Sequence, residues 1–235
     1  MGRETERFDV AGHWMDAVRR LAKRLLFLSF APGRLTRPLF NLLYAVIWYG
    51  RELFEWLRRA CVATPIFLAR CKAYGADVSV DRVPYMTGLC RIELGSQVRI
   101  SGKIGIAAPS KGGSRLRIGS GVFIGHGCSF GVASRVEIGD FVAIGGQTFI
   151  TDTEGHATYN PRRAIWDVPA SADDVSPVVI ENNVQIGRYC VILKGVTIGA
   201  RSIVGAGSVL RTSVPPDSIV MGNPARVVKR LVATD

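Results

Sequence analysis

The sequence predicts an all-β solenoid of about five stacked coils, preceded by an α-helical extension. An aliphatic residue recurs every six positions in the C-terminal half, and near Gly75 the composition changes from Leu, Arg and aromatic residues to Gly, Val, Ile and Ser. With 235 residues and 48% apolar content, the chain can bury a sizeable core. We therefore expect a basic, amphipathic helical extension at 1–75, a β-helix at 76–214 and a separate tail at 215–235.

The extension begins with apolar residues at helical spacing opposite a basic face, over residues 14–30. An apolar run at 39–50 is shorter than the roughly twenty residues that cross a bilayer, and Arg51 and Glu52 end it. We expect residues 14–60 either to bind an anionic membrane peripherally or to cap the β-helix. The charged start MGRETERFDV does not resemble a signal peptide, which predicts a cytoplasmic protein that can lie at the inner face of the membrane.

The repeat is clearest near the C-terminus, where the aliphatic residues follow one another without a slip: Ile180, Ile186, Ile192, Ile198, Val204 and Leu210. Six α-helical residues rotate a side chain by about 600°, so a helix cannot keep this row on one face. A short strand and a turn in every six residues, with three such units per triangular coil, can do so. A β-sandwich would show a period of two instead.

Earlier rows repeat the pattern, with a two-residue slip between the second and third: Ile92, Val98 and Ile104; Ile118, Ile124 and Phe130; Val132, Ile138, Ile144 and Ile150. Stacked coils leave an open end unless another segment covers it. We expect the N-terminal helices and the C-terminal tail to cap the solenoid.

Two segments interrupt the repeat, at 107–114 and at 151–177. The second contains His156, Arg162, Arg163 and Trp166 together with several carboxylates. Long loops in compact domains are usually functional or disordered, and we interpret this one as functional.

Charge and cysteines limit the functional classes. The net charge of +11 comes without a nucleic-acid-binding motif, so phosphate-bearing ligands and lipids are better candidate partners than nucleic acids. The five cysteines include no CxxC pair and no zinc-finger spacing. They indicate reduced, packed thiols and no metal site. A carbonic-anhydrase zinc site needs three histidines, whereas the repeat region holds only His126 and His156.

The run from Ile186 to Leu231, which contains GNPAR, resembles the end of hexapeptide-repeat acyltransferases, such as galactoside and maltose O-acetyltransferases and polysaccharide O-acetyltransferases. The resemblance extends over about residues 92–231. It implies a left-handed parallel β-helix, a homotrimer, and acetyl-CoA in a groove between neighbouring subunits.

The resemblance also implies site residues. His156 takes the place of the catalytic base, and Asp152 either orients it, binds a substrate hydroxyl, or is simply an exposed loop carboxylate. Arg162 and Trp166 are candidates for substrate binding. The coenzyme contacts correspond to Ala206, Arg211, Thr212, Arg226 and Lys229. The asparagine with which sugar acetyltransferases orient the acceptor is replaced here by Gly125.

The sequence as a whole predicts an acetyl-CoA-dependent O-acetyltransferase that modifies a saccharide hydroxyl in polysaccharide, O-antigen or glycolipid biosynthesis. Two alternatives stay open. One is acyl transfer to another small alcohol or to an amine, and the other is a non-catalytic β-helix scaffold.

Overall fold

The computed structural model describes residues 15, 18–20, 22–23, 33–109, 111–155 and 174–231. The chain divides into two compact units, residues 1–52 and residues 53–235. Most of the first described helix, α2 (Arg37–Arg58), belongs to the first unit. The second unit contains the β-helix, the short π-helix η1 (Arg59–Ala63) and α3 (Thr64–Leu68).

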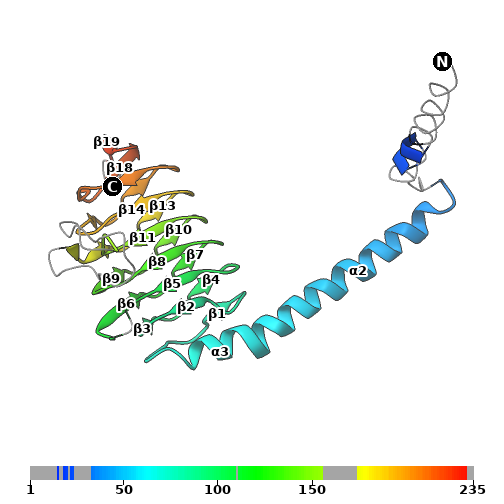
Figure 1. Cartoon of the computed structure of the whole chain (residues 1–235), viewed down its shortest axis with the longest axis horizontal. Helices are drawn as coiled ribbons and strands as arrows, with labels where there is room; N and C mark the ends of the chain where they lie inside the picture. The colour runs from blue at the N-terminus through cyan, green and yellow to red at the C-terminus, as the bar shows by residue number, and fades with distance from the viewer. Residues whose placement is uncertain are drawn as a thin grey trace, which may run out of the picture. The chain divides into compact units, whose positions relative to one another are not determined.

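The β-helix consists of three parallel sheets that the chain visits in turn, once per coil (Figure 1). The eight-stranded sheet contains β1 (Ser79–Val80), β4 (Arg99–Ile100), β7 (Phe123–Ile124), β10 (Ala143–Ile144), β13 (Gln185–Ile186), β16 (Ile203–Val204), β18 (Ser218–Gly222) and the antiparallel β19 (Ala225–Arg230). The six-stranded sheet contains β2 (Tyr85–Thr87), β5 (Gly105–Ala107), β8 (Ser129–Gly131), β11 (Phe149–Thr151), β14 (Val191–Ile192) and β17 (Val209–Leu210). The five-stranded sheet contains β3 (Cys90–Leu94), β6 (Ser114–Ile118), β9 (Arg135–Ile138), β12 (Val178–Ile180) and β15 (Thr197–Ile198).

Aliphatic residues from successive coils stack in register and form the core. In the eight-stranded sheet the buried column is Val80, Ile100, Ile124, Ile144, Ile186, Val204 and Val220. Because side chains alternate along a strand, the preceding residue of each short strand faces outward. The six-residue repeat therefore provides both the buried core and the outer surface of each sheet, as the sequence predicts.

The six-stranded sheet contributes one strand to each coil, which gives about six coils. This is one more than the sequence predicts. The first coil begins at Ser79, ahead of the row from which counting started. That row, Ile92, Val98 and Ile104, is buried but lies two residues out of phase with the stacked column positions Leu94, Ile100 and Ile106.

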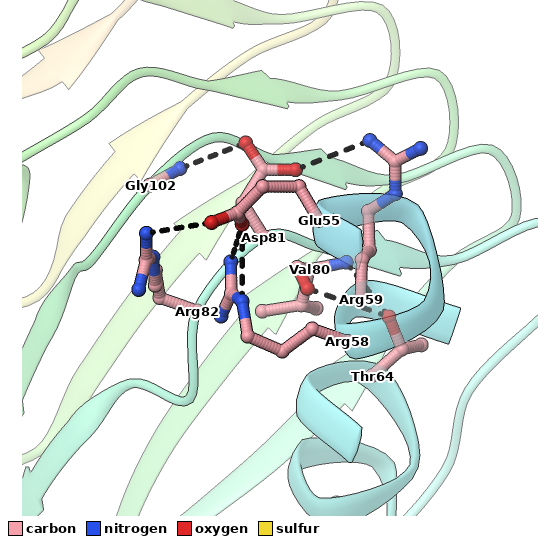
Figure 2. A network of polar contacts seen from close by, with 8 residues as sticks. All are labelled: Glu55, Arg58, Arg59, Thr64, Val80, Asp81, Arg82 and Gly102. Atoms are coloured by element: carbon pink, nitrogen blue, oxygen red, sulfur yellow. Dashed lines mark hydrogen bonds and ion pairs between the residues drawn. The ribbon is translucent and has the colours of Figure 1, made fainter. Parts of the chain in front are cut away.

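The last helical residues cap the first coil. Val80 donates its backbone N–H to Thr64 Oγ1 at 3.0 Å, and Phe67 is buried in the core cluster. Figure 2 shows the polar contacts around this cap, in which Asp81 accepts a hydrogen bond from the backbone N–H of Gly102 at 3.0 Å. Thr64 and Phe67 therefore close the open end that the sequence predicts.

Ion pairs join the end of α2 to the first coil. Glu55 pairs with Arg82 at 3.3 Å and also with Arg58, and Arg59 pairs with Asp81 at 3.5 Å (Figure 2). These five side chains are partly or largely exposed, so each pair contributes little stability alone.

The remainder of α2 carries an exposed row of apolar residues. None of its residues is buried, and one row along it, Leu39, Leu43, Val46, Leu53 and Leu57, is 44–63% exposed. In the part of the chain that the structure describes, no helix is long and apolar enough to cross a membrane.

At the other end, the C-terminal segment forms a hairpin. β18 continues the eight-stranded sheet in parallel with β16, and β19 folds back on it. Residues 218–230 are thus the final layer of the β-helix, and the boundary predicted at residue 215 falls just before that layer.

Candidate active site

One corner of the β-helix differs from the other two in length. The connections from the five-stranded to the eight-stranded sheet, such as 119–122 and 139–142, have four residues each. Those from the eight-stranded to the six-stranded sheet, such as 125–128 and 145–148, also have four. The corner from the six-stranded to the five-stranded sheet, which we call the variable corner, includes 108–113, 132–134 and 152–177. Both interruptions of the repeat therefore leave the solenoid at the same corner.

Asp152 anchors the longest of these connections. Its carboxylate accepts backbone hydrogen bonds from Ala133 and Ser134, both at 2.7 Å, and from Arg135 at 2.6 Å. The side chain is fully buried, so the interpretation of Asp152 as an exposed loop carboxylate is wrong. The carboxylate thus satisfies three backbone N–H groups at the corner of the coil below. These charge-assisted hydrogen bonds make Asp152 a structural anchor for the loop.

The two ends of the loop also bind each other. Thr153 and Val175 form an antiparallel bridge, and Glu154 donates its backbone N–H to the carbonyl of Asp174 at 3.1 Å. Ser176 donates to the carbonyl of Asp152 at 2.9 Å. The chain therefore leaves the solenoid and returns to it through a short closed neck.

A groove of about 940 Å³ runs along the six-stranded sheet beside this neck. Its walls include Tyr85 and Phe149 on the sheet, Lys111 from the shorter excursion, and Thr153 and Gly155 from the neck. This volume falls within the range of small-molecule sites, roughly 300–1,000 Å³. Its position beside the loop makes the groove the candidate active site.

His156 directly follows Gly155, the last described residue of the neck, which lines the groove. His156, Arg162 and Trp166 all lie outside the described residues, so their placement stays a prediction.

The candidate coenzyme residues belong to the last coils. Ala206 is an exposed residue of the corner after β16, and Arg211 and Thr212 are exposed immediately after β17. Arg226 and Lys229 are exposed on β19, where they pair with Met221 and Ile219.

None of these five candidate residues lines the groove. The groove does reach Leu193, which donates its backbone N–H to the carbonyl of Leu210 at 3.1 Å. Arg211 is the next residue in the chain. The groove therefore ends one coil away from the first of the candidate coenzyme cations.

Gly125 has a steric reason to differ from the asparagine of sugar acetyltransferases. A Cβ at this position would lie 2.5 Å from the backbone nitrogen of Gly146, on the coil above. Any side chain would push these two coils apart. The departure from the asparagine of those relatives therefore has a reason of packing.

The cysteines within the coils are neutral packing residues. Cys128 and Cys190 are buried, and their thiols donate to the carbonyls of Gly145 and Gly205, both at 3.3 Å. Burial raises the pKa of both thiols above the ordinary value. Neither is an activated nucleophile, because nucleophilic attack needs the thiolate.

Sequence reasoning missed the groove residues on the sheet, although a signal for them exists. Tyr85 and Phe149 each precede an inward-facing residue, Met86 and Ile150, and so face outward on the same sheet. What the spacing could not reveal is which of the three outer faces carries a groove, because this depends on the neck.

Comparisons with known proteins agree with this architecture. Residues 177–212 match the family described as bacterial transferase hexapeptide (six repeats). Galactoside O-acetyltransferase of Escherichia coli K12 is 33% identical over 119 residues, 51% of this chain and 56% of that protein. A probable acetyltransferase of Mycobacterium tuberculosis is 30% identical over 185 residues, 77% of this chain and 57% of that protein. The chain thus spans a little over half the length of these relatives.

Two solved structures share the fold. A variant of the N-acyltransferase AntD from Bacillus cereus, in complex with dTDP-4-amino-4,6-dideoxyglucose and coenzyme A, has a TM-score of 0.57 at 20% identity and covers 72% of this chain and 89% of its own. The polysialic acid O-acetyltransferase OatWY has a TM-score of 0.54 at 23% identity and covers 70% and 77%. The chain thus has a parallel β-helix fold, its residues 177–212 match the hexapeptide-repeat family, and it is similar in sequence to galactoside O-acetyltransferase and other acetyltransferases.

Proposed function

We propose that this protein is an acetyl-CoA-dependent O-acetyltransferase that modifies a saccharide hydroxyl. The observation that carries the proposal is the groove beside the neck. Gly155 lines this groove, and His156 is the next residue in the chain. The similarity to galactoside O-acetyltransferase, over 51% of the chain, supports the same reaction class.

His156 acts as the general base in this proposal. Neutral imidazole removes the proton from the acceptor hydroxyl while that oxygen attacks the thioester carbonyl carbon. The carbon–sulfur bond then breaks, and the imidazolium returns its proton to the coenzyme A thiolate. Transfer is direct, without an acyl-enzyme, in keeping with the raised pKa values of Cys128 and Cys190. Asp152 fixes the neck through its three backbone contacts, while Arg162 and Trp166 bind the acceptor.

The coenzyme binds along the last coils in this proposal. Ala206 is small and exposed, which leaves its backbone accessible to the pantetheine arm. Arg211, Arg226 and Lys229 are exposed cations suited to the phosphates, and Thr212 adds a hydroxyl beside them. Coenzyme A is bound in a structure of similar fold, the AntD variant named above.

We further propose a homotrimer with peripheral contact to an anionic membrane through residues 14–60. The exposed apolar row on α2 and the net charge of +11 support the membrane contact. A cytoplasmic enzyme at the inner face of the membrane would reach lipid-linked sugars, which fits a role in polysaccharide, O-antigen or glycolipid biosynthesis.

The test is a transfer assay with labelled acetyl-CoA and a panel of acceptors: galactosides, maltose, lipid-linked oligosaccharides and an amino-sugar nucleotide. We expect a product ester on a sugar hydroxyl. His156→Ala should lower turnover by about a hundredfold to ten-thousandfold, the usual cost of removing a general base, and leave acetyl-CoA affinity unchanged. The matched control is His126→Ala, since His126 is exposed on a four-residue corner and accepts a backbone N–H from Lys103 at 3.4 Å.

Each outcome decides a different part of the proposal. An amide product with the amino-sugar nucleotide alone would establish the alternative of N-acyl transfer. Wild-type turnover in His156→Ala would contradict its assignment as the base. Failure to bind acetyl-CoA would favour the non-catalytic scaffold.

A further inference from the structure

A second pocket lies at the variable corner and faces the five-stranded sheet. It has a volume of about 620 Å³ and is lined by residues near the start of the β-helix, including Arg70, Lys72, Arg91 and Arg115. Gly112 and Gly113, from the excursion that also borders the groove, form another part of its wall. None of its lining residues belongs to the groove or to the candidate coenzyme residues.

The charges around this pocket do not balance. Glu93 is the carboxylate beside it, and this residue contacts Arg91 Nε and Arg115 Nη2, both at 2.7 Å. Those contacts hold the pKa of Glu93 below its usual value, so Glu93 stays ionised at neutral pH. Among the residues that the structure describes, Glu93 is the one carboxylate that forms ion pairs with these four cations, and Glu137 adds a weaker electrostatic interaction with Arg115.

Arg70 and Lys72 are exposed, and neither forms an ion pair with the residues that the structure describes. The backbone holds them beside the sheet, because Lys72 donates its N–H to the carbonyl of Ile92 at 2.8 Å and Ala73 pairs with Glu93. Uncompensated like charges held together attract a multivalent anion.

We propose that this pocket binds a phosphate-bearing ligand, with Arg70 and Lys72 as the principal contacts and Arg91 and Arg115 as supporting cations. Arginine and lysine form charge-assisted hydrogen bonds with phosphate oxygens. The volume exceeds what one phosphate needs, and the exposed side chain of Leu89 in the wall offers an apolar contact for an ester group. The ligand is therefore a phosphate ester or diphosphate, whether a soluble compound or a lipid headgroup.

The experiment is isothermal titration of the full-length protein with inorganic pyrophosphate, and separately with dihexanoyl phosphatidic acid below its micellar concentration. In the double variant Arg70→Gln and Lys72→Gln, we expect the affinity to fall by at least about tenfold, the equivalent of one charge-assisted contact. Glu93→Gln should raise the affinity, because it removes the opposing carboxylate and releases two arginines. A steep loss of affinity at higher salt should accompany binding.

The matched control is Arg99→Gln with Lys103→Gln, which removes the same charge from exposed positions elsewhere on the solenoid. Tighter binding of phosphatidic acid would identify a lipid headgroup, and tighter binding of pyrophosphate a soluble ligand. Circular dichroism and thermal unfolding confirm that each variant is folded. Lack of binding by both probes, or equal losses in the control and the test pair, would overturn the proposal.

Discussion

At the scale of single residues, burial and contacts decide between roles that the sequence alone leaves open. Asp152 stands at the start of the interrupting segment, and its position in the sequence suggests a role in the reaction. Its partners Ala133, Ser134 and Arg135 lie on the coil below, 17 to 19 residues earlier. A sequence without coordinates cannot assign those three contacts, because they depend on how the excursion stacks on the preceding corner.

Asp152→Asn should destabilise the fold. The amide nitrogen must face at least one of the three backbone donors, which leaves a buried N–H without an acceptor at a cost of about 1–3 kcal/mol. Chemical denaturation followed by circular dichroism measures the loss. The control is Asp140→Asn, since Asp140 accepts one backbone N–H, from Ser120 at 2.7 Å, and an amide oxygen can replace that acceptor. Equal stability of the two variants would show that Asp152 does not anchor the loop.

The half-buried cysteines should react slowly with alkylating agents. Burial raises the pKa of Cys71 and Cys90 from 9.0 to about 11. The reactive thiolate is therefore scarce at pH 8, and the alkylation rate should rise about tenfold per pH unit until the pH approaches that pKa. Mass spectrometry of iodoacetamide-treated protein measures each site, with the exposed Cys61 as the internal reference. A rate that levels off near pH 9 would contradict the pKa shift.

At the scale of elements, the cap expected from the N-terminal region comes from Thr64 and Phe67 in α3. The apolar row on α2 is exposed, and its contact with a membrane stays a prediction. Helical periodicity in the sequence predicts an amphipathic helix whether that helix packs on the β-helix or lies on a membrane. What covers its apolar side depends on tertiary packing, which the periodicity does not contain.

Charge placed on the apolar side of α2 should abolish membrane binding. Leu43→Glu should prevent flotation with vesicles that contain phosphatidylglycerol, because the carboxylate would have to enter the apolar layer. Asn41→Glu adds the same charge about 200° around the helix and is the matched control. Full-length protein that fails to float, or equal loss in both variants, would contradict the membrane proposal and favour a protein partner for this helix.

At the scale of the whole molecule, the three outer faces of the solenoid differ in chemistry. The outward positions of the five-stranded sheet carry a ladder of charges: Arg91, Glu93, Arg115, Arg117, Arg135 and Glu137. The other two sheets present exposed aromatic residues, including Phe123 on the eight-stranded sheet and Tyr85 and Phe149 on the six-stranded sheet. Exposed aromatic side chains are typical of interfaces, so we expect subunits to meet through these two sheets.

Multi-angle light scattering should give three times the chain mass of 25.5 kDa. Phe123→Glu should weaken the trimer by burying a charge at the contact. Thr197→Glu introduces the same charge on the five-stranded sheet and should leave the mass unchanged. A monomeric wild-type protein at micromolar concentration would refute the trimer.

The sequence predicts the solenoid well because the six-residue repeat is a local signal. From Ile118 onward most of the repeating aliphatic residues lie in a strand of their own, whereas Val98 and Ile104 lie in corners. The sequence does not predict that the excursions at 107–114 and 151–177 share a corner. Nor does it predict a cationic pocket made from Arg70, Lys72, Arg91 and Arg115, which come from three adjacent layers of chain. These features follow from the stacking of layers, which brings together residues about twenty positions apart.

The confinement of length changes to the variable corner bears on protein engineering. A residue inserted into a four-residue corner would rotate the next strand and expose the buried column that begins at Val80. The neck closed by Thr153 and Val175 isolates the long loop from that register. Loops of other lengths could therefore be grafted between these two residues without disturbing the coils. The solenoid would then serve as a constant scaffold, and variants with new acceptor preferences could be selected from libraries of loop sequences.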